Sequence, residues 1–136
     1  MDFTVQTVCV FEPLYLRLLT LGVAAAGIAA ICSVAIALRR ILATNVRGSS
    51  GHPVFHLTIL AVVMLHVVAA AFYFAGHLQQ VSEYQQTHGA APALRSAVLH
   101  EAGVHALAAL AVLVLMGVSY AAWRQAARPL VAHPTS

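Results

Sequence analysis

Three histidines recur at helical spacing in the second of three long apolar segments. His56 and His66 lie inside residues 54–76, and His77 follows that segment directly. At about 100° per residue the three side chains lie within roughly 80° of one another on a helix, and successive ones are roughly 15 Å apart along it. Histidine is the commonest protein ligand of haem iron and transition metals, and titratable groups in a bilayer usually face protein, water or a cofactor. The spacing therefore predicts buried histidine chemistry.

A second group of candidate ligands, His100, Glu101 and His105, lies near the start of the third apolar segment. Glu101 and His105 are four residues apart and share a helix face, whereas His100 and His105 are about 140° apart. Counted from the centres of the two apolar segments, His77 and His100 both lie roughly 18 Å toward the same side. In antiparallel neighbouring helices we therefore expect His77 to lie level with this group, near one membrane face.

Two kinds of cofactor site fit this group. In the first, His77 and either His100 or His105 are the axial ligands of a b-type haem held between facing helices. In the second, His77, Glu101 and either His100 or His105 bind a bare copper or zinc ion, for which imidazole is a suitable ligand. The sequence alone leaves both open.

The remaining two of the five candidate histidines, His66 and His56, lie away from this group. Matching the apolar centres offsets His105 from His66 by roughly 10 Å in depth, so His66 has no evident partner in this chain. We expect it to pair with another subunit, to ligate a cofactor alone or to hydrogen-bond a neighbouring helix. His56 lies at a membrane face, where a quinone head group or a haem propionate would meet it. The alternative for every one of these histidines is a plain interhelical hydrogen bond.

Composition defines the class of protein that must position these residues. Of the 136 residues, 61% are hydrophobic and only 8% are charged, against roughly 25% charged in soluble domains. The mean hydropathy is +0.86. The formal charge of +3 is too small to favour nucleic-acid binding. The sequence contains no C-x-x-C motif, which would have indicated thiol redox chemistry. We predict an all-α integral membrane protein with a single membrane domain.

Three segments reach the roughly 20 apolar residues that cross a bilayer, and we expect them to form an antiparallel bundle. They cover residues of about 14–42, 54–76 and 102–123. The outer loop is expected over 77–96, with the second helix continuing to about Thr87 before Gly89 and Pro92 break it. In the first segment Gly22, Ala26, Ala30 and Ser33 form a seam of small residues, which predicts close helix packing within the chain or against a partner.

The arginines predict the orientation in the membrane. Five of the seven lie at the end of the first segment, between the first two or after the third: Arg39, Arg40, Arg47, Arg124 and Arg128. The positive-inside rule makes that side cytoplasmic, so the N-terminus faces outward and the C-terminus inward. We expect a multi-pass protein of a bacterial inner membrane.

In size and number of spans the chain resembles the three-helix anchor subunits of succinate and fumarate dehydrogenases, which hold b-type haem and bind quinone. That family's Ser…Arg pattern before the first helix and its His…Asp-Tyr arrangement do not occur here, so the resemblance implies architecture and no residue roles. The leading hypothesis is a small membrane subunit of an electron-transfer complex, with haem or quinone at its histidines. The alternatives are a subunit of a copper or zinc membrane protein and a cofactor-free accessory subunit. The expected partners of this chain are the lipid bilayer and other membrane subunits, and a homodimer is one possible arrangement.

Overall fold

The computed structural model describes residues 13–43 and 53–127. Within these ranges the chain forms three helices: α2 (Leu14–Leu42), α3 (Pro53–His88) and α4 (Pro92–Ala126). Each is long and apolar enough to cross a membrane. The predicted class, a multi-pass helical membrane protein, is therefore supported. Two of the arginines from which the orientation was predicted, Arg47 and Arg128, lie outside the described residues.

The ends of the helices follow from a few residues. Pro13 precedes α2, and its carbonyl accepts hydrogen bonds from the N–H groups of Leu16 at 2.9 Å and Arg17 at 3.2 Å. Proline suits such a position because its missing N–H would have no partner in a first helical turn. Arg39 and Arg40 occupy the last turn of α2, where positive charge favours the helix dipole. The bounds of α2 agree with the predicted first segment.

The loop expected over 77–96 is corrected by the structure, because helix occupies most of that range. Only residues 89–91 connect α3 to α4. Gly89 has φ of +89°, a conformation that L side chains rarely adopt, and its N–H bonds to the Gln85 carbonyl at 3.0 Å. The predicted continuation of α3 to Thr87 is confirmed to within one residue.

An inward-facing apolar stripe explains why both helices continue through this polar stretch. Exposed polar side chains alternate there with buried apolar ones, which form a second core cluster with the start of α2. Its members are Leu16, Ala70, Phe74, Val81, Leu94 and Val98. The polar residues thus occupy the outer face of helices whose inner face remains apolar.

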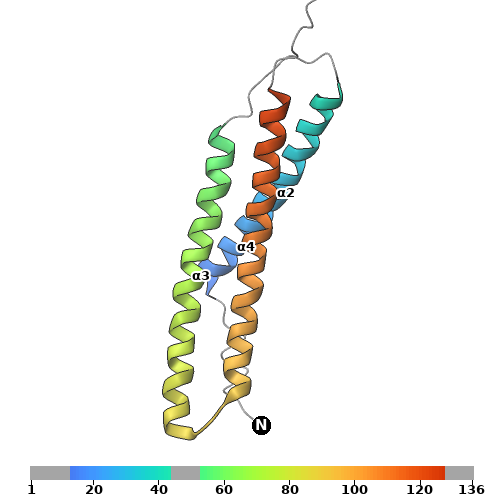
Figure 1. Ribbon diagram of the computed structural model, residues 1–136. Helices are drawn as coiled ribbons and strands as arrows, with labels where there is room; N and C mark the ends of the chain where they lie inside the picture. Colours follow the sequence, from blue (N-terminus) through green and yellow to red (C-terminus); the bar gives the residue numbers. More distant parts are fainter. Residues whose placement is uncertain (1–12, 44–52, 128–136) are drawn as a thin grey trace, which may run out of the picture.

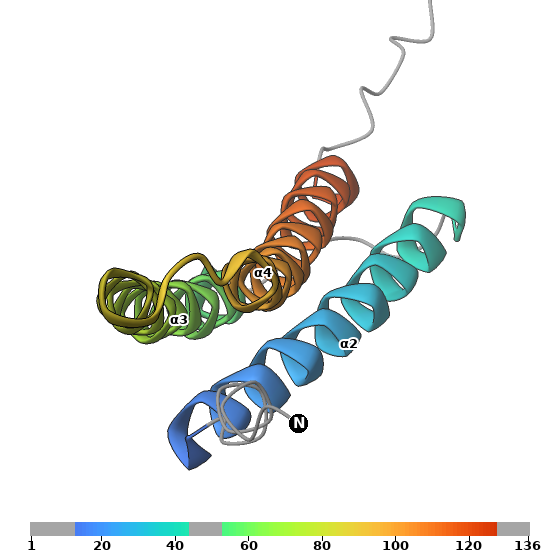
Figure 2. The same cartoon turned by 90° about the horizontal axis from the view of Figure 1, so that it is seen from below.

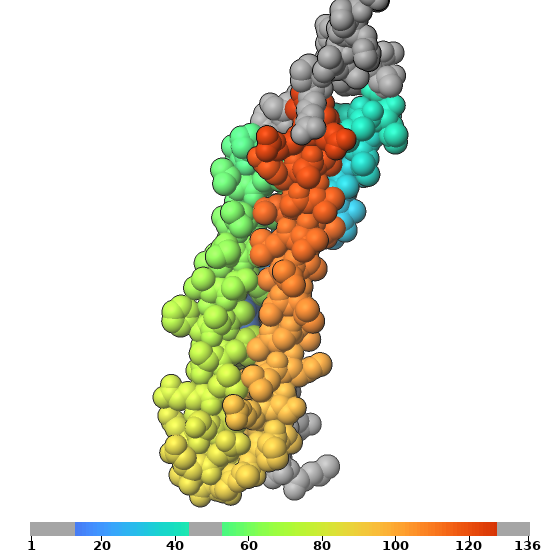
Figure 3. Space-filling model, viewed as in Figure 1, coloured from blue at the N-terminus to red at the C-terminus, as the bar shows by residue number. Residues whose placement is uncertain are grey.

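The α3–α4 hairpin and α2 form a three-helix arrangement in which every helix packs on the other two. Figure 1 shows α3 and α4 side by side, with α2 crossing behind them and beginning well short of the closed end of the hairpin. Seen along the bundle, α2 crosses the hairpin at an angle (Figure 2). The space-filling view shows α3 and α4 side by side, with the start of α2 behind them and its end visible beside α4 (Figure 3).

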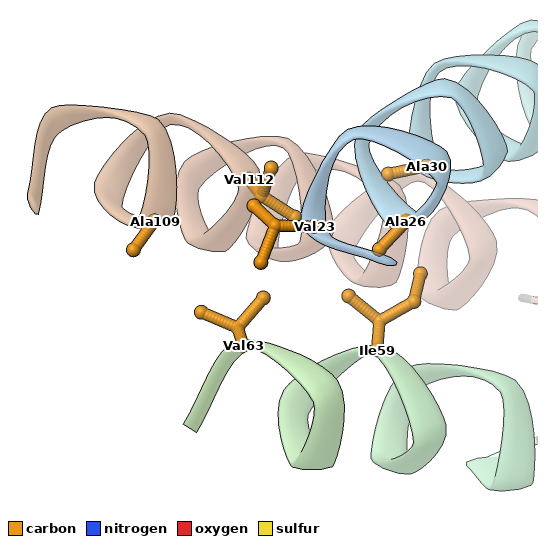
Figure 4. Close-up of a cluster of buried hydrophobic side chains, with 7 residues drawn as sticks. All are labelled: Val23, Ala26, Ala30, Ile59, Val63, Ala109 and Val112. Atoms are coloured by element: carbon orange, nitrogen blue, oxygen red, sulfur yellow. The ribbon is translucent and has the colours of Figure 1, made fainter. Parts of the chain in front are cut away.

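Small residues on α2 allow this crossing to be close. The main core cluster contains seven buried residues, whose side chains from all three helices point toward one another in Figure 4: Val23, Ala26, Ala30, Ile59, Val63, Ala109 and Val112. A Cβ atom at Gly27 would lie 3.2 Å from Cγ2 of Val112. The small-residue seam therefore packs inside the chain, as one of the two expected arrangements.

Candidate functional site

A pair of histidines joins α3 to α4 between the two core clusters. Nδ1 of His105 lies 3.3 Å from Nε2 of His66, and the two rings stack with centroids 5.2 Å apart and planes inclined by 27°. His66 is only 1% exposed, and the Phe74 ring lies 5.3 Å from that of His105. One imidazole donates and the other accepts, according to tautomer. Two metal-ligating side chains thus face each other in an apolar environment.

The expectation that His66 has no evident partner in this chain is therefore wrong, and its contact with His105 matches one of the three expected alternatives, a hydrogen bond to a neighbouring helix. The helix register explains why this partner was not foreseen. His56 of α3 meets Ser119 of α4 at 3.2 Å. His66 lies ten residues after His56 on α3, so it is level with Ala109, which lies ten residues before Ser119 on α4. Ala109 is about one helical turn, or about 6 Å, from His105. Two imidazole side chains reach across that offset. Matching the centres of the two apolar segments had overestimated the depth offset between His66 and His105.

The structure does not assemble the outer group of His77, His100, Glu101 and His105. The Nδ1–H of His77 donates to the Tyr73 carbonyl of its own helix at 3.0 Å, and its ring lies 4.2 Å from the Tyr73 ring. His100 is exposed and Glu101 is half-buried. Over the ranges 13–43 and 53–127, no three His, Cys, Asp or Glu side chains are grouped to hold a metal ion.

The reason lies in the faces of α4. His105 is directed toward α3, where it contacts His66. His100 lies about 140° around the same helix, so both cannot face the hairpin partner. Of the five candidate histidines, the structure joins His66 to His105 and leaves His77 and His100 out of that contact.

His56 belongs to a separate polar network that connects all three helices. Its Nε2 donates to the Ser119 hydroxyl at 3.2 Å, because that hydroxyl itself donates to Ser33 at 2.8 Å. The indole N–H of Trp123 also donates to Ser33, at 2.8 Å. Ser119 is fully buried, and Ser33 and His56 are 8% and 9% exposed. His56 is thus buried among the helices, and its expected meeting with a quinone head group or a haem propionate at a membrane face stays a prediction.

Sequence reasoning missed Ser119 as the hydrogen-bond partner of His56, and Ser33 and Trp123 as further members of the same network. A signal was present, because each of the other two helices carries a serine within its apolar segment. Serine in a membrane helix commonly bonds across helices or back to its own backbone. Deciding between these two kinds of hydrogen bond requires the register of the neighbouring helices, which the sequence alone does not supply.

The chain matches no protein-family model, no curated protein and no solved structure at a significant level. The candidate site is therefore interpreted from its own geometry.

Replacing Ser119 with alanine should weaken the contact among the three helices. Ser119→Ala removes two hydrogen bonds from a fully buried site and should lower the free energy of unfolding by about 1 kcal/mol. Denaturation of the protein in detergent micelles, followed by the fluorescence of its only tryptophan, Trp123, measures this. Ser96→Ala, at an exposed position of α4, is the control. Equal stability of both variants and the parent would contradict the assigned network.

Proposed function

We propose that this protein is a small membrane subunit of an electron-transfer complex and that His66 and His105 hold a redox-active copper ion in it. The observation that supports the proposal is the 3.3 Å contact between Nδ1 of His105 and Nε2 of His66. It joins imidazoles of facing helices in an otherwise apolar region. Buried ionisable side chains in membrane helices commonly mark functional sites.

A b-type haem between these two histidines does not fit this geometry. Metal–imidazole bonds of about 2 Å would place two in-line nitrogens about 4 Å apart, and the macrocycle would have to lie across the line between them. The Phe74 ring already lies against His105 at 5.3 Å, and Ala70 and Ala109 are buried on the facing helices. Haem would therefore require α3 and α4 to separate.

A bare ion would require a much smaller displacement of α3 and α4 than haem would. The two nitrogens need to separate by only about 0.7 Å to accept an ion between them with bonds of about 2 Å. Zinc normally takes four protein ligands in a closed site, and no third candidate ligand joins this pair in the described part of the chain. Burial in a region of low dielectric penalises a doubly charged ion more than a singly charged one. Copper(I) fits two neutral imidazoles best.

One-electron chemistry would require the ion to cycle between copper(I) and copper(II). His66 and His105 would supply two ligands and a dry environment that favours copper(I), and the further ligands that copper(II) prefers would have to come from a partner subunit or a reactant. The chain would act with other membrane subunits that provide the electron donor and acceptor, with quinone as one class of reactant. Exposed apolar surface supports a role as a subunit. At most 28% of the most apolar window of any of the three helices is buried inside the chain, which leaves wide faces for lipid or for partner helices.

A second candidate is a cofactor-free accessory subunit, and the His56 network favours it. His56 shows that this chain uses one histidine as a hydrogen-bonding residue between helices. The contact of His66 with His105 would then be another such bond, with a contribution of about 1 kcal/mol.

Metal binding distinguishes the two candidates. The purified chain in mild detergent, loaded with copper(I) under reducing conditions and freed of excess, should retain about one copper, with two nitrogen ligands in its X-ray absorption spectrum. His105→Gln keeps a hydrogen-bonding group but loses the metal ligand, so its copper affinity should fall on the order of tenfold or more.

His100→Gln is the matched control, because it removes an exposed histidine from the same helix. It should retain copper as the parent does. An absence of copper binding by the parent would contradict the metal site and favour the accessory role. A b-type haem spectrum in the native preparation that is lost on His77→Ala or His100→Gln would instead indicate the outer group.

For the orientation we propose an outward N-terminus and an inward C-terminus in a bacterial inner membrane. The support is the set of arginines at the open end of the hairpin together with the positive-inside rule. An enzyme reporter that is active only in the periplasm should be active when inserted after His88 and silent when fused after Ser136. The reverse pattern would contradict this orientation.

A further inference from the structure

Aromatic rings in contact form a continuous row from the buried histidine pair toward the hairpin turn. The His66 ring stacks on that of His105, and the centre of the Phe74 ring lies 5.3 Å from that of His105. Phe74 lies 5.1 Å from the Tyr73 ring, which in turn lies 4.2 Å from the ring of His77. Such separations are typical of aromatic rings in van der Waals contact. We call these five residues the ring row.

The surrounding structure holds the ring row in place along its length. Phe74 is only 5% exposed and belongs to the core cluster near the hairpin turn. The Nδ1–H of His77 donates to the Tyr73 carbonyl at 3.0 Å, which fixes the orientation of the last ring. His77 is half-buried and lies roughly 16 Å beyond His66 along α3. The row therefore connects a buried pair of metal-ligating side chains with a partly exposed position.

The helices offer no comparable row toward the open end of the hairpin. No aromatic residue occurs over 57–65 of α3, 106–119 of α4 or 16–42 of α2. An electron moving that way from His66 would cross roughly 15 Å of aliphatic side chains before it reached His56. Electron tunnelling slows exponentially with the length of a saturated path, and π systems in contact shorten that path. The side of the hairpin turn is therefore favoured for electron transfer.

We infer that electrons enter and leave the copper site at His66 and His105 along the ring row, to and from a partner that docks beside His77. The inference rests on the copper site proposed above. In the outward step copper(I) loses one electron and becomes copper(II), and a one-electron acceptor of the partner, such as a ferric haem, is reduced by that electron. The inward step is the reverse. No bond of the row forms or breaks, because its rings only provide orbitals through which the electron tunnels.

A photochemical label tests the direction of electron transfer. The full chain, with both of its cysteines replaced by serine, carries a ruthenium polypyridyl complex on Gln80→Cys or on Val118→Cys and is loaded with copper(I). Both positions are exposed, and each lies roughly 20 Å along its helix from the nearer of His66 and His105, on opposite sides of the pair. Flash generation of ruthenium(III), followed by its absorbance, measures how fast copper(I) reduces it.

The label at Gln80→Cys should be reduced faster than the label at Val118→Cys on the order of tenfold, equivalent to about 1.4 kcal/mol of activation free energy. Tyr73→Leu with Phe74→Leu removes two rings of the row but keeps apolar side chains, so it should abolish most of this advantage. Phe72→Leu is the matched control, because it removes a ring that is 79% exposed on the same helix and should leave the rate unchanged.

Metal analysis of each labelled protein separates the possible failures. Equal rates from the two labels in a protein that retains copper would overturn the ring path and leave the copper site standing. An equal slowing in Phe72→Leu and in the double variant would also overturn it. If the double variant loses copper, Tyr73→Leu alone should still slow the label at Gln80→Cys, and an unchanged rate there would contradict the inference. Absence of copper from the labelled parent would overturn this inference and the proposed function together.

Discussion

In hydrocarbon, a polar side chain can find hydrogen-bond partners only within protein, because lipid chains offer none. This constraint shapes the arrangement of the three helices. His66 meets His105 between the core clusters, and His56 meets Ser119 nearer the open end of the α3–α4 hairpin. Both contacts join α3 to α4, so together they define how the two helices face each other and at what register. Slippage by a turn would separate both pairs at once.

Small residues make the polar contacts with α2 attainable. Ser33 receives hydrogen bonds from both Ser119 and Trp123 of α4, which requires α2 to lie close to that helix. Ala26 and Ala30 are buried on the same stretch of α2, and a Cβ atom at Gly27 would lie only 3.2 Å from the Val112 side chain, a tight contact. Packing and hydrogen bonding therefore act together here, as is typical where water provides no driving force between helices.

Much of the fold could be predicted from local sequence. The bounds of α2 and the continuation of α3 beyond its apolar segment follow from apolar stripes and from proline and glycine positions, which act over a few residues. The length of α4 was underestimated because polar residues after Pro92 were interpreted as loop, although Leu94 and Val98 face the core. A stripe of about one apolar residue per turn is sufficient for a helix when a neighbouring helix covers it.

The candidate site was harder to predict because it depends on contacts between helices. Whether His105 reaches His66 or joins His77 is decided by a register difference of about 4 Å, which is less than one helical turn, and the centres of apolar segments do not locate depth more finely than that. The serines of the His56 network carry little signal by themselves, since a single hydroxyl in an apolar helix commonly bonds to its own backbone. Sequence analysis thus identified residues capable of the chemistry, and the structure selected the pair.

The nitrogen–nitrogen contact itself tests this account most directly. Solid-state NMR of the protein in bilayers, with ¹⁵N-labelled histidine, detects coupling between two imidazole nitrogens across one hydrogen bond. The structure predicts a correlation between Nε2 of His66 and Nδ1 of His105 in the metal-free protein, lost in His105→Gln. A spectrum without that correlation, or one in which it survives His105→Gln, would contradict the pairing on which the proposed site depends.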